Sequence, residues 1–138
     1  MIQLMTTYQV QSDQVIIELT ESSALSDMDL ATTNTILLRE AGLKIALDDW
    51  GAGNTSFATM RRITFDILKI DGGLIAGIGK SRLDEAVIQH LLKMSEEIGF
   101  TIVAEGVETA SQLLWLKQAG CKYAQGYHLG MPKLLGDS

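Results

Sequence analysis

Short apolar runs alternate along the chain with longer segments in which apolar residues recur at helical spacing. The short runs are rich in β-branched residues, and several are apolar at consecutive positions, as in Ile16-Ile17 and Thr101-Ile102-Val103-Ala104. Consecutive apolar residues are typical of strands that are covered on both faces, and such strands are mostly parallel. The pattern predicts five strands, at residues 15–19, 44–47, 67–70, 101–104 and 123–127.

Three segments between the predicted strands have the spacing of helices, and a glycine follows each of them. The clearest covers residues 83–98, and Gly99 is expected to cap it in the left-handed conformation. Its apolar stripe is predicted to hold Leu83, Ala86, Val87, His90, Leu91, Met94 and Ile98. The other helices are predicted at residues 29–41, before Gly42, and after Thr109, ending before Gly120. Because a strand follows each helix, we expect parallel βα units.

Every predicted strand ends in or leads into a side chain that can bind a metal ion or a proton. These side chains are Glu18 and Glu21, Asp48 and Asp49, Lys69 and Asp71, Glu105, and Gln125. Five βα units fit a doubly wound sheet or part of a (β/α)8 barrel, and barrel enzymes gather their chemistry at the carboxyl ends of several strands. We therefore predict an α/β fold of the TIM-like (β/α) barrel type. A complete barrel takes about 250 residues, so a chain of 138 residues is expected to be a portion of one, with about five βα units.

The charge balance narrows the choice of partners. The chain has 17 acidic and 11 basic residues and a net charge of -6. Such a chain has no general attraction for nucleic acid or anionic lipid, so we expect no DNA or RNA binding and no membrane contact by this segment. A phosphate substrate would need positive charge from elsewhere, and a divalent metal ion is the obvious source. The single cysteine, Cys121, cannot form an internal disulfide, which favours a reducing, cytoplasmic location.

Four carboxylates would converge at one end of the sheet if the barrel prediction holds: Glu18, Asp48, Asp49 and Glu105. Two unit charges at about 4 Å repel each other by roughly 4 kcal/mol at an effective dielectric constant of 20. Such a cluster stays ionised only with cations among it, and hard divalent metal ions prefer oxygen ligands. The alternative is a set of unrelated, solvated carboxylates at loop starts.

Lys69 lies between Leu68 and Ile70 in an apolar predicted strand, so its ammonium group needs a partner. Asp71, two residues further on, is one candidate, and the carboxylate cluster is the other. A purely structural ion pair is the alternative to a role in catalysis. Gln125 could likewise bind a ligand or only cap the end of a strand.

Five motifs in order carry a family resemblance. They are Glu18-Leu19-Thr20-Glu21-Ser22, Asp48-Asp49-Trp50-Gly51-Ala52-Gly53, Leu68-Lys69-Ile70-Asp71, Ala104-Glu105-Gly106-Val107-Glu108-Thr109 and Gln125-Gly126-Tyr127. With these motifs the chain resembles the EAL family of bacterial cyclic di-GMP phosphodiesterases, from about residue 15 to residue 133. The resemblance implies a TIM-like barrel that acts in second-messenger signal transduction and hydrolyses cyclic di-GMP to pGpG with Mg²⁺ or Mn²⁺.

The resemblance also implies a role for each matching residue. Glu18 and Asp48 would be metal ligands, with Asp48 shared between two ions and Asp49 serving the second ion. Lys69 would hold the attacking water, and Glu105 would bind the second ion or act as general base. Glu21 would brace the loop after Asp49, which contributes to dimer contacts in the family. Asp71, Glu108 and Gln125 would be supporting polar residues.

The chain departs from the family pattern upstream of Glu18. It contains neither the Glu-Ala-Leu segment that names the family nor the metal-binding asparagine that follows that segment. We therefore expect residues 1–138 to be the C-terminal part of an EAL domain. The site for the first ion would be incomplete, and the isolated chain would be inactive and would form homodimers or otherwise self-associate. The alternative is a non-catalytic EAL-like signalling module that binds cyclic di-GMP or a protein partner. The parent protein could be anchored to a membrane elsewhere.

Overall fold

The computed structural model describes Met5, residues 7–53 and residues 57–131. Residues 132 and 133, at the end of the expected family match, lie outside this part. The chain divides into two compact units, Met1–Lys69 and Ile70–Ser138. The boundary falls inside strand β3 (Ile67–Ile70), and each unit is described by itself.

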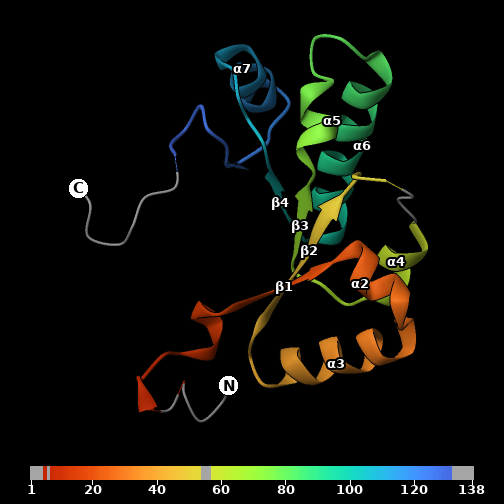
Figure 1. The fold of residues 1–138 in the computed structure, drawn as a ribbon, viewed down its shortest axis with the longest axis vertical. Helices are drawn as coiled ribbons and strands as arrows, with labels where there is room; N and C mark the ends of the chain where they lie inside the picture. The colour runs from red at the N-terminus through yellow and green to blue at the C-terminus, as the bar shows by residue number, and fades with distance from the viewer. Residues whose placement is uncertain (1–4, 6, 54–56, 132–138) are drawn as a thin grey trace. The chain divides into compact units, whose positions relative to one another are not determined.

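Unit 1 holds two parallel strands and the start of a third, with helices between them (Figure 1). Its elements in chain order are η1 (Ser12–Gln14), β1 (Ile16–Thr20), α2 (Glu21–Ser26), α3 (Met28–Glu40), β2 (Lys44–Trp50), α4 (Phe57–Arg62) and the start of β3. Strand β1 runs parallel to β2, with Glu18 opposite Ala46 and Thr20 opposite Asp48. The core of the unit lies in β2, where Ile45, Ala46 and Leu47 are at most 1% exposed. These three consecutive buried residues show that β2 is covered on both faces. The same prediction for Ile16-Ile17 is wrong, since Ile16 is 49% exposed at the start of β1.

Unit 2 continues the same alternation. It holds the end of β3, then α5 (Gly72–Ala76), α6 (Arg82–Ile98), β4 (Thr101–Ala104), α7 (Ala110–Gln118) and β5 (Tyr123–Ala124). Strand β4 runs parallel to β5, with Val103 opposite Tyr123. Ser81 caps the start of α6 by accepting a hydrogen bond from the Asp84 N–H, and Gly99 ends the helix at φ +95°, as predicted.

The buried face of α6 is not the predicted stripe. The buried residues are Ile88, Leu91, Leu92 and Ser95. Leu83 and Ile98, which we predicted to be at the ends of the apolar stripe, are 73% and 70% exposed. His90 is exposed too, and its Nδ1 lies 2.7 Å from the Ala86 carbonyl oxygen on the same helix. The stripe prediction shared only Leu91 with the buried face because apolar residues occur on more than one side of this helix.

The last strand is shorter than predicted, ending at Ala124 rather than at residue 127. Beyond β5, the backbone of residues 125–128 is hydrogen-bonded to Val107, in the segment that follows β4. The Val107 N–H donates to the Gln125 carbonyl, and the His128 N–H donates to the Val107 carbonyl. Gly126 allows this approach, since a Cβ at Gly126 would lie 2.3 Å from the Val107 backbone nitrogen. The close backbone contact replaces the regular ladder, so the strand ends.

The order of neighbouring strands decides between the two folds considered from the sequence. The order is β1-β2-β3 in unit 1 and β3-β4-β5 in unit 2, so each strand lies beside the next one along the chain. A doubly wound sheet reverses its strand order at a switch point, whereas a (β/α) barrel does not. The strand order therefore confirms the prediction of a portion of a TIM-like barrel.

In the described part of the chain, no helix combines the length and the apolar content that crossing a membrane requires.

Candidate metal and catalytic site

The carboxylates of two strands in unit 1 converge on Lys69. This lysine is 8% exposed. Its Nζ lies 2.9 Å from Oε1 of Glu18, on β1, and 3.3 Å from Oδ1 of Asp48, on β2. The parallel register explains the convergence, because it brings the carboxyl ends of β1 and β2 together. Of the partners considered from the sequence, Glu18 and Asp48 of the carboxylate cluster pair with Lys69. The Asp71 carboxylate accepts a hydrogen bond from the Gly73 N–H (2.7 Å) and caps α5.

Asp49 has a backbone conformation that non-glycine residues seldom adopt, with φ +58°. Aspartate tolerates the left-handed region better than most residues. The Asp49 N–H donates to Oδ1 of Asp48 (2.9 Å), and Gly51, at φ +101°, continues the turn. Asp48 is half-buried and Asp49 is exposed. Neighbouring residues of an ideal strand point to opposite faces, and the turn at Asp49 departs from that geometry.

Glu21 is the first residue of α2, and it is 6% exposed. Thr20 caps this helix by accepting a hydrogen bond from the Ser23 N–H. A carboxylate in the first turn of a helix is stabilised by the helix dipole. Residues 54–56 of the loop that Glu21 is expected to brace lie outside the described residues, so that role stays a prediction.

In unit 2, Glu105 follows β4 and is paired with Gln125, which follows β5. The Gln125 side-chain amide donates to Oε1 of Glu105 over 2.5 Å. The Glu105 N–H donates to the Ile70 carbonyl (3.0 Å). Both the backbone and the carboxylate of Glu105 are therefore held in place, and the residue is half-buried.

Glu108 lies two residues before α7 and lines a pocket of about 540 Å³. Gly106, Gln125, Gly126 and Tyr127 are other residues that line this pocket. The Glu108 N–H donates to the side chain of Gln112, a buried residue that was not predicted from the sequence. A signal for it was present, since Thr109 and Gln112 have the spacing of a capping box.

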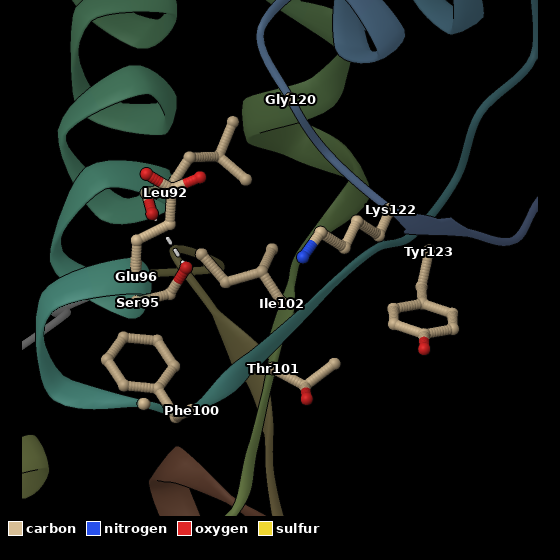
Figure 2. Close-up of a pocket in the computed structure, with 10 residues that line it drawn as sticks. Leu92, Ser95, Glu96, Phe100, Thr101, Ile102, Gly120, Lys122 and Tyr123 are labelled. Atoms are coloured by element: carbon tan, nitrogen blue, oxygen red, sulfur yellow. Dashed lines mark hydrogen bonds between the residues drawn. The ribbon is translucent and has the colours of Figure 1, made fainter.

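A second pocket, of about 310 Å³, lies at the opposite ends of the strands (Figure 2). Phe100, Thr101 and Ile102 line it at the amino end of β4, and Lys122 and Tyr123 at the amino end of β5. Because barrel enzymes carry out their chemistry at the carboxyl ends of the strands, this pocket is not a candidate for the active site.

Burial raises the pKa of the Cys121 thiol. The thiol donates to the Tyr123 carbonyl, and a raised pKa disfavours the reactive thiolate.

Comparison with known proteins gives the family. The EAL domain family profile matches residues 1–132. The cyclic di-GMP phosphodiesterase PdeF of Escherichia coli K12 is 35% identical over 136 residues, which are 99% of this chain and 18% of PdeF.

Two solved structures are similar in fold as well as in sequence. The PaMucR phosphodiesterase in complex with c-di-GMP has a TM-score of 0.84 and 32% identity, covering 94% of this chain and 53% of that one. The manganese and cyclic di-GMP complex of Klebsiella pneumoniae BlrP1 at pH 6 has a TM-score of 0.83 and 34% identity, covering 88% of this chain and 31% of that one. The chain thus spans about half of the solved PaMucR chain and less than a fifth of PdeF. By the profile match over nearly its whole length, the chain belongs to the EAL domain family.

Proposed function

We propose that this chain is the C-terminal part of an EAL domain whose parent protein hydrolyses cyclic di-GMP to pGpG with the help of Mg²⁺ or Mn²⁺. The observation that carries the proposal is the convergence of Glu18 and Asp48 on the buried Lys69. The comparisons support the substrate, since PdeF is named a cyclic di-GMP phosphodiesterase and the PaMucR phosphodiesterase and BlrP1 structures are complexes with that nucleotide.

The residues present fit a divalent metal ion. Glu18 and Asp48 direct oxygens toward one positive charge, the Lys69 ammonium group, and hard cations prefer such oxygen donors. We assign Glu18, Asp48, Asp49 and Glu105 as metal ligands. When bound, the ions supply positive charge to the phosphodiester and lower the pKa of water.

The remaining roles belong to side chains of this chain. Lys69 donates a hydrogen bond to the attacking water and holds it in place. Glu105 would hold a metal ion or accept the proton of that water, and the hydrogen bond from Gln125 orients its carboxylate. Asp71, Glu108 and Glu21 are supporting residues. Asp71 fixes the start of α5, Glu108 lines the larger pocket, and Glu21 begins α2.

The second candidate function is a signalling module that binds cyclic di-GMP or a protein partner without hydrolysing the nucleotide. The observation that favours it is the pairing of Lys69 with Glu18 and Asp48, because a purely structural ion pair would give the same contacts. The two candidates differ in whether pGpG is released.

The test is turnover of cyclic di-GMP by the full-length protein with Mn²⁺, measured as pGpG release. Glu105→Gln keeps the shape of the side chain and an oxygen for the Gln125 amide but removes the charge. We expect its kcat to fall by at least the roughly 10²-fold typical of a lost general acid–base group. Glu97→Gln, an exposed change on α6, is the matched control and should leave kcat unchanged.

Near-normal turnover by Glu105→Gln would contradict its assignment. A wild-type protein that binds cyclic di-GMP without releasing pGpG would favour the signalling module.

A further inference from the structure

Gln112 is a buried side chain that joins two segments far apart in the sequence. It is 7% exposed and lies in the first turn of α7. Its Oε1 accepts hydrogen bonds from the N–H groups of Glu108 (2.9 Å) and Thr109 (3.0 Å). Its Nε2 donates to the carbonyl of Ile75, on α5 (3.3 Å). Two N–H groups need an acceptor and one carbonyl needs a donor, so these partners fix the orientation of the amide.

The segment that Gln112 holds carries two of the proposed site residues. It runs from Glu105 to Thr109, between β4 and α7, and is called here the β4–α7 loop. Backbone contacts fix its first three residues. The Glu105 N–H donates to Ile70, the Val107 N–H donates to Gln125, and a Cβ on Gly106 would lie 2.9 Å from the Cα of Gly72.

The last two residues of the β4–α7 loop are held differently. The side chain of Gln112 is the partner of the Glu108 N–H and of the Thr109 N–H. Glu108 is exposed and lines the pocket of about 540 Å³ beside Gln125 and Tyr127. The position of its carboxylate in that pocket therefore depends on Gln112, whereas Glu105 has restraints of its own.

The bond to Ile75 gives Gln112 more than a capping role. A capping box needs only the acceptor oxygen of the glutamine, for the backbone of its own helix end. The amide nitrogen instead reaches α5, which begins just after the Asp71 cap and contains the fully buried Ile75. This hydrogen bond thus fixes the end of the β4–α7 loop against α5, the helix that follows β3.

We propose that Gln112 is a positioning residue for substrate binding: it fixes the backbone of Glu108 against α5, so that the Glu108 carboxylate is held ready for the nucleotide in the larger pocket. This inference rests on the proposed function. It assigns to Gln112 an effect on the binding of cyclic di-GMP and not on the proton transfer at Glu105.

Two variants and one control separate this role from helix capping. Gln112→Glu keeps an oxygen for the two N–H groups but places a second oxygen against the Ile75 carbonyl. Gln112→Met keeps the length of the side chain and removes all three hydrogen bonds. The control is Thr109→Ala, which removes the other half of the capping box, the hydrogen bond from the Gln112 N–H to Oγ1 of Thr109. That change leaves the bonds of the Gln112 side chain in place.

The experiment measures KM and kcat of the full-length protein for cyclic di-GMP with Mn²⁺, and amide hydrogen exchange across residues 105–112. Gln112→Met should raise KM about tenfold, as expected for lost buried hydrogen bonds, with a smaller change in kcat. The Glu108 amide should exchange faster in this variant. Gln112→Glu should fall between Gln112→Met and wild type, because it keeps the capping oxygen. Thr109→Ala should lower Tm and leave KM unchanged.

The proposal is overturned if Gln112→Met lowers Tm while KM and the exchange of the Glu108 amide stay at wild-type values. It is also overturned if Thr109→Ala raises KM as much as Gln112→Met does. A wild-type protein that neither binds nor hydrolyses cyclic di-GMP would refute the proposed function instead. In that case, the exchange of the Glu108 amide alone decides whether Gln112 positions Glu108.

Discussion

Lys69 shows, at the scale of single residues, how burial decides which of two ion pairs matters. Its Nζ is nearer to Glu18 (2.9 Å) than to Asp48 (3.3 Å). However, the Glu18 side chain is 52% exposed and that of Asp48 only 16%. Solvent screens an exposed pair, so the closer contact contributes little to stability. The charge of Lys69 therefore acts mainly on Asp48, one of the proposed metal ligands.

A prediction at this scale is that Lys69→Met abolishes most of the catalysis by the full-length protein. The change keeps the apolar stem but removes the group that is proposed to hold the attacking water. We expect kcat for cyclic di-GMP to fall by about 10²-fold or more. Lys93→Met, on the exposed side of α6, is the control. Should Lys69→Met turn over substrate as fast as the control while both remain folded by circular dichroism, Lys69 would be only a structural ion pair.

At the scale of elements, the sequence predicted best where a segment was long enough to show its period. The long helices α3 and α6 were predicted to within one residue at each end. The helices α2, α4 and α5 were missed, because five or six residues make less than two turns and show no clear stripe. Their start signals, such as Thr20 before α2 and Asp71 before α5, also occur in turns.

For the site as well, the sequence predicted the features that depend on local position and missed those that depend on tertiary contacts. The sequence placed Glu18, Asp48, Glu105 and Gln125 at or just after strand ends because position along a strand is local information. The end of β2 was nevertheless predicted too early, at residue 47, since the strand continues through Asp48 and Asp49 to Trp50. It could not choose between Asp71 and the carboxylates as partners of Lys69, since the register of β1 on β2 is set by tertiary packing. The contact of Gln112 with Ile75, 37 residues away, was equally outside the reach of a local pattern.

A prediction at the scale of elements concerns the stability effect of a substitution at Gly126, just after the end of β5. Gly126→Ala would place a Cβ 2.3 Å from two backbone atoms of Val107, with φ at +157°. Overpacking of this kind costs about 1–3 kcal/mol of unfolding free energy or more. Gly79→Ala is the control. Gly79 has φ +80°, but no atom lies within 4 Å of the added Cβ. This variant therefore isolates the cost of backbone strain, about 1–2 kcal/mol. Urea unfolding should show the larger loss for Gly126→Ala; equal losses would mean that β5 moves freely away from Val107.

At the scale of the whole molecule, the first strand has an open side. Strand β1 pairs with β2, and the described part of the chain provides no strand for its other edge. Ile16, at the start of β1, is 49% exposed. An unpaired edge is available to another strand, and the solved PaMucR phosphodiesterase chain is nearly twice as long as the part that this chain matches. We propose that residues 1–138 need further strands for a complete site and self-associate without them.

The corresponding prediction compares residues 1–138 alone with the same residues joined to the part of the PaMucR phosphodiesterase chain that they do not match. The chain alone keeps Asp48, Asp49 and Glu105, so it should bind Mn²⁺ weakly, because one or two carboxylates suffice for a largely hydrated ion. Its release of pGpG should be near background, since an open site admits water that weakens electrostatic interactions. Sedimentation should show oligomers for the chain alone. The joined chain should release pGpG well above background, and this difference should vanish in its Glu105→Gln variant. Equal specific activity of the two wild-type chains, with the short one a stable monomer, would contradict this prediction. It would show that the joined part contributes nothing to catalysis.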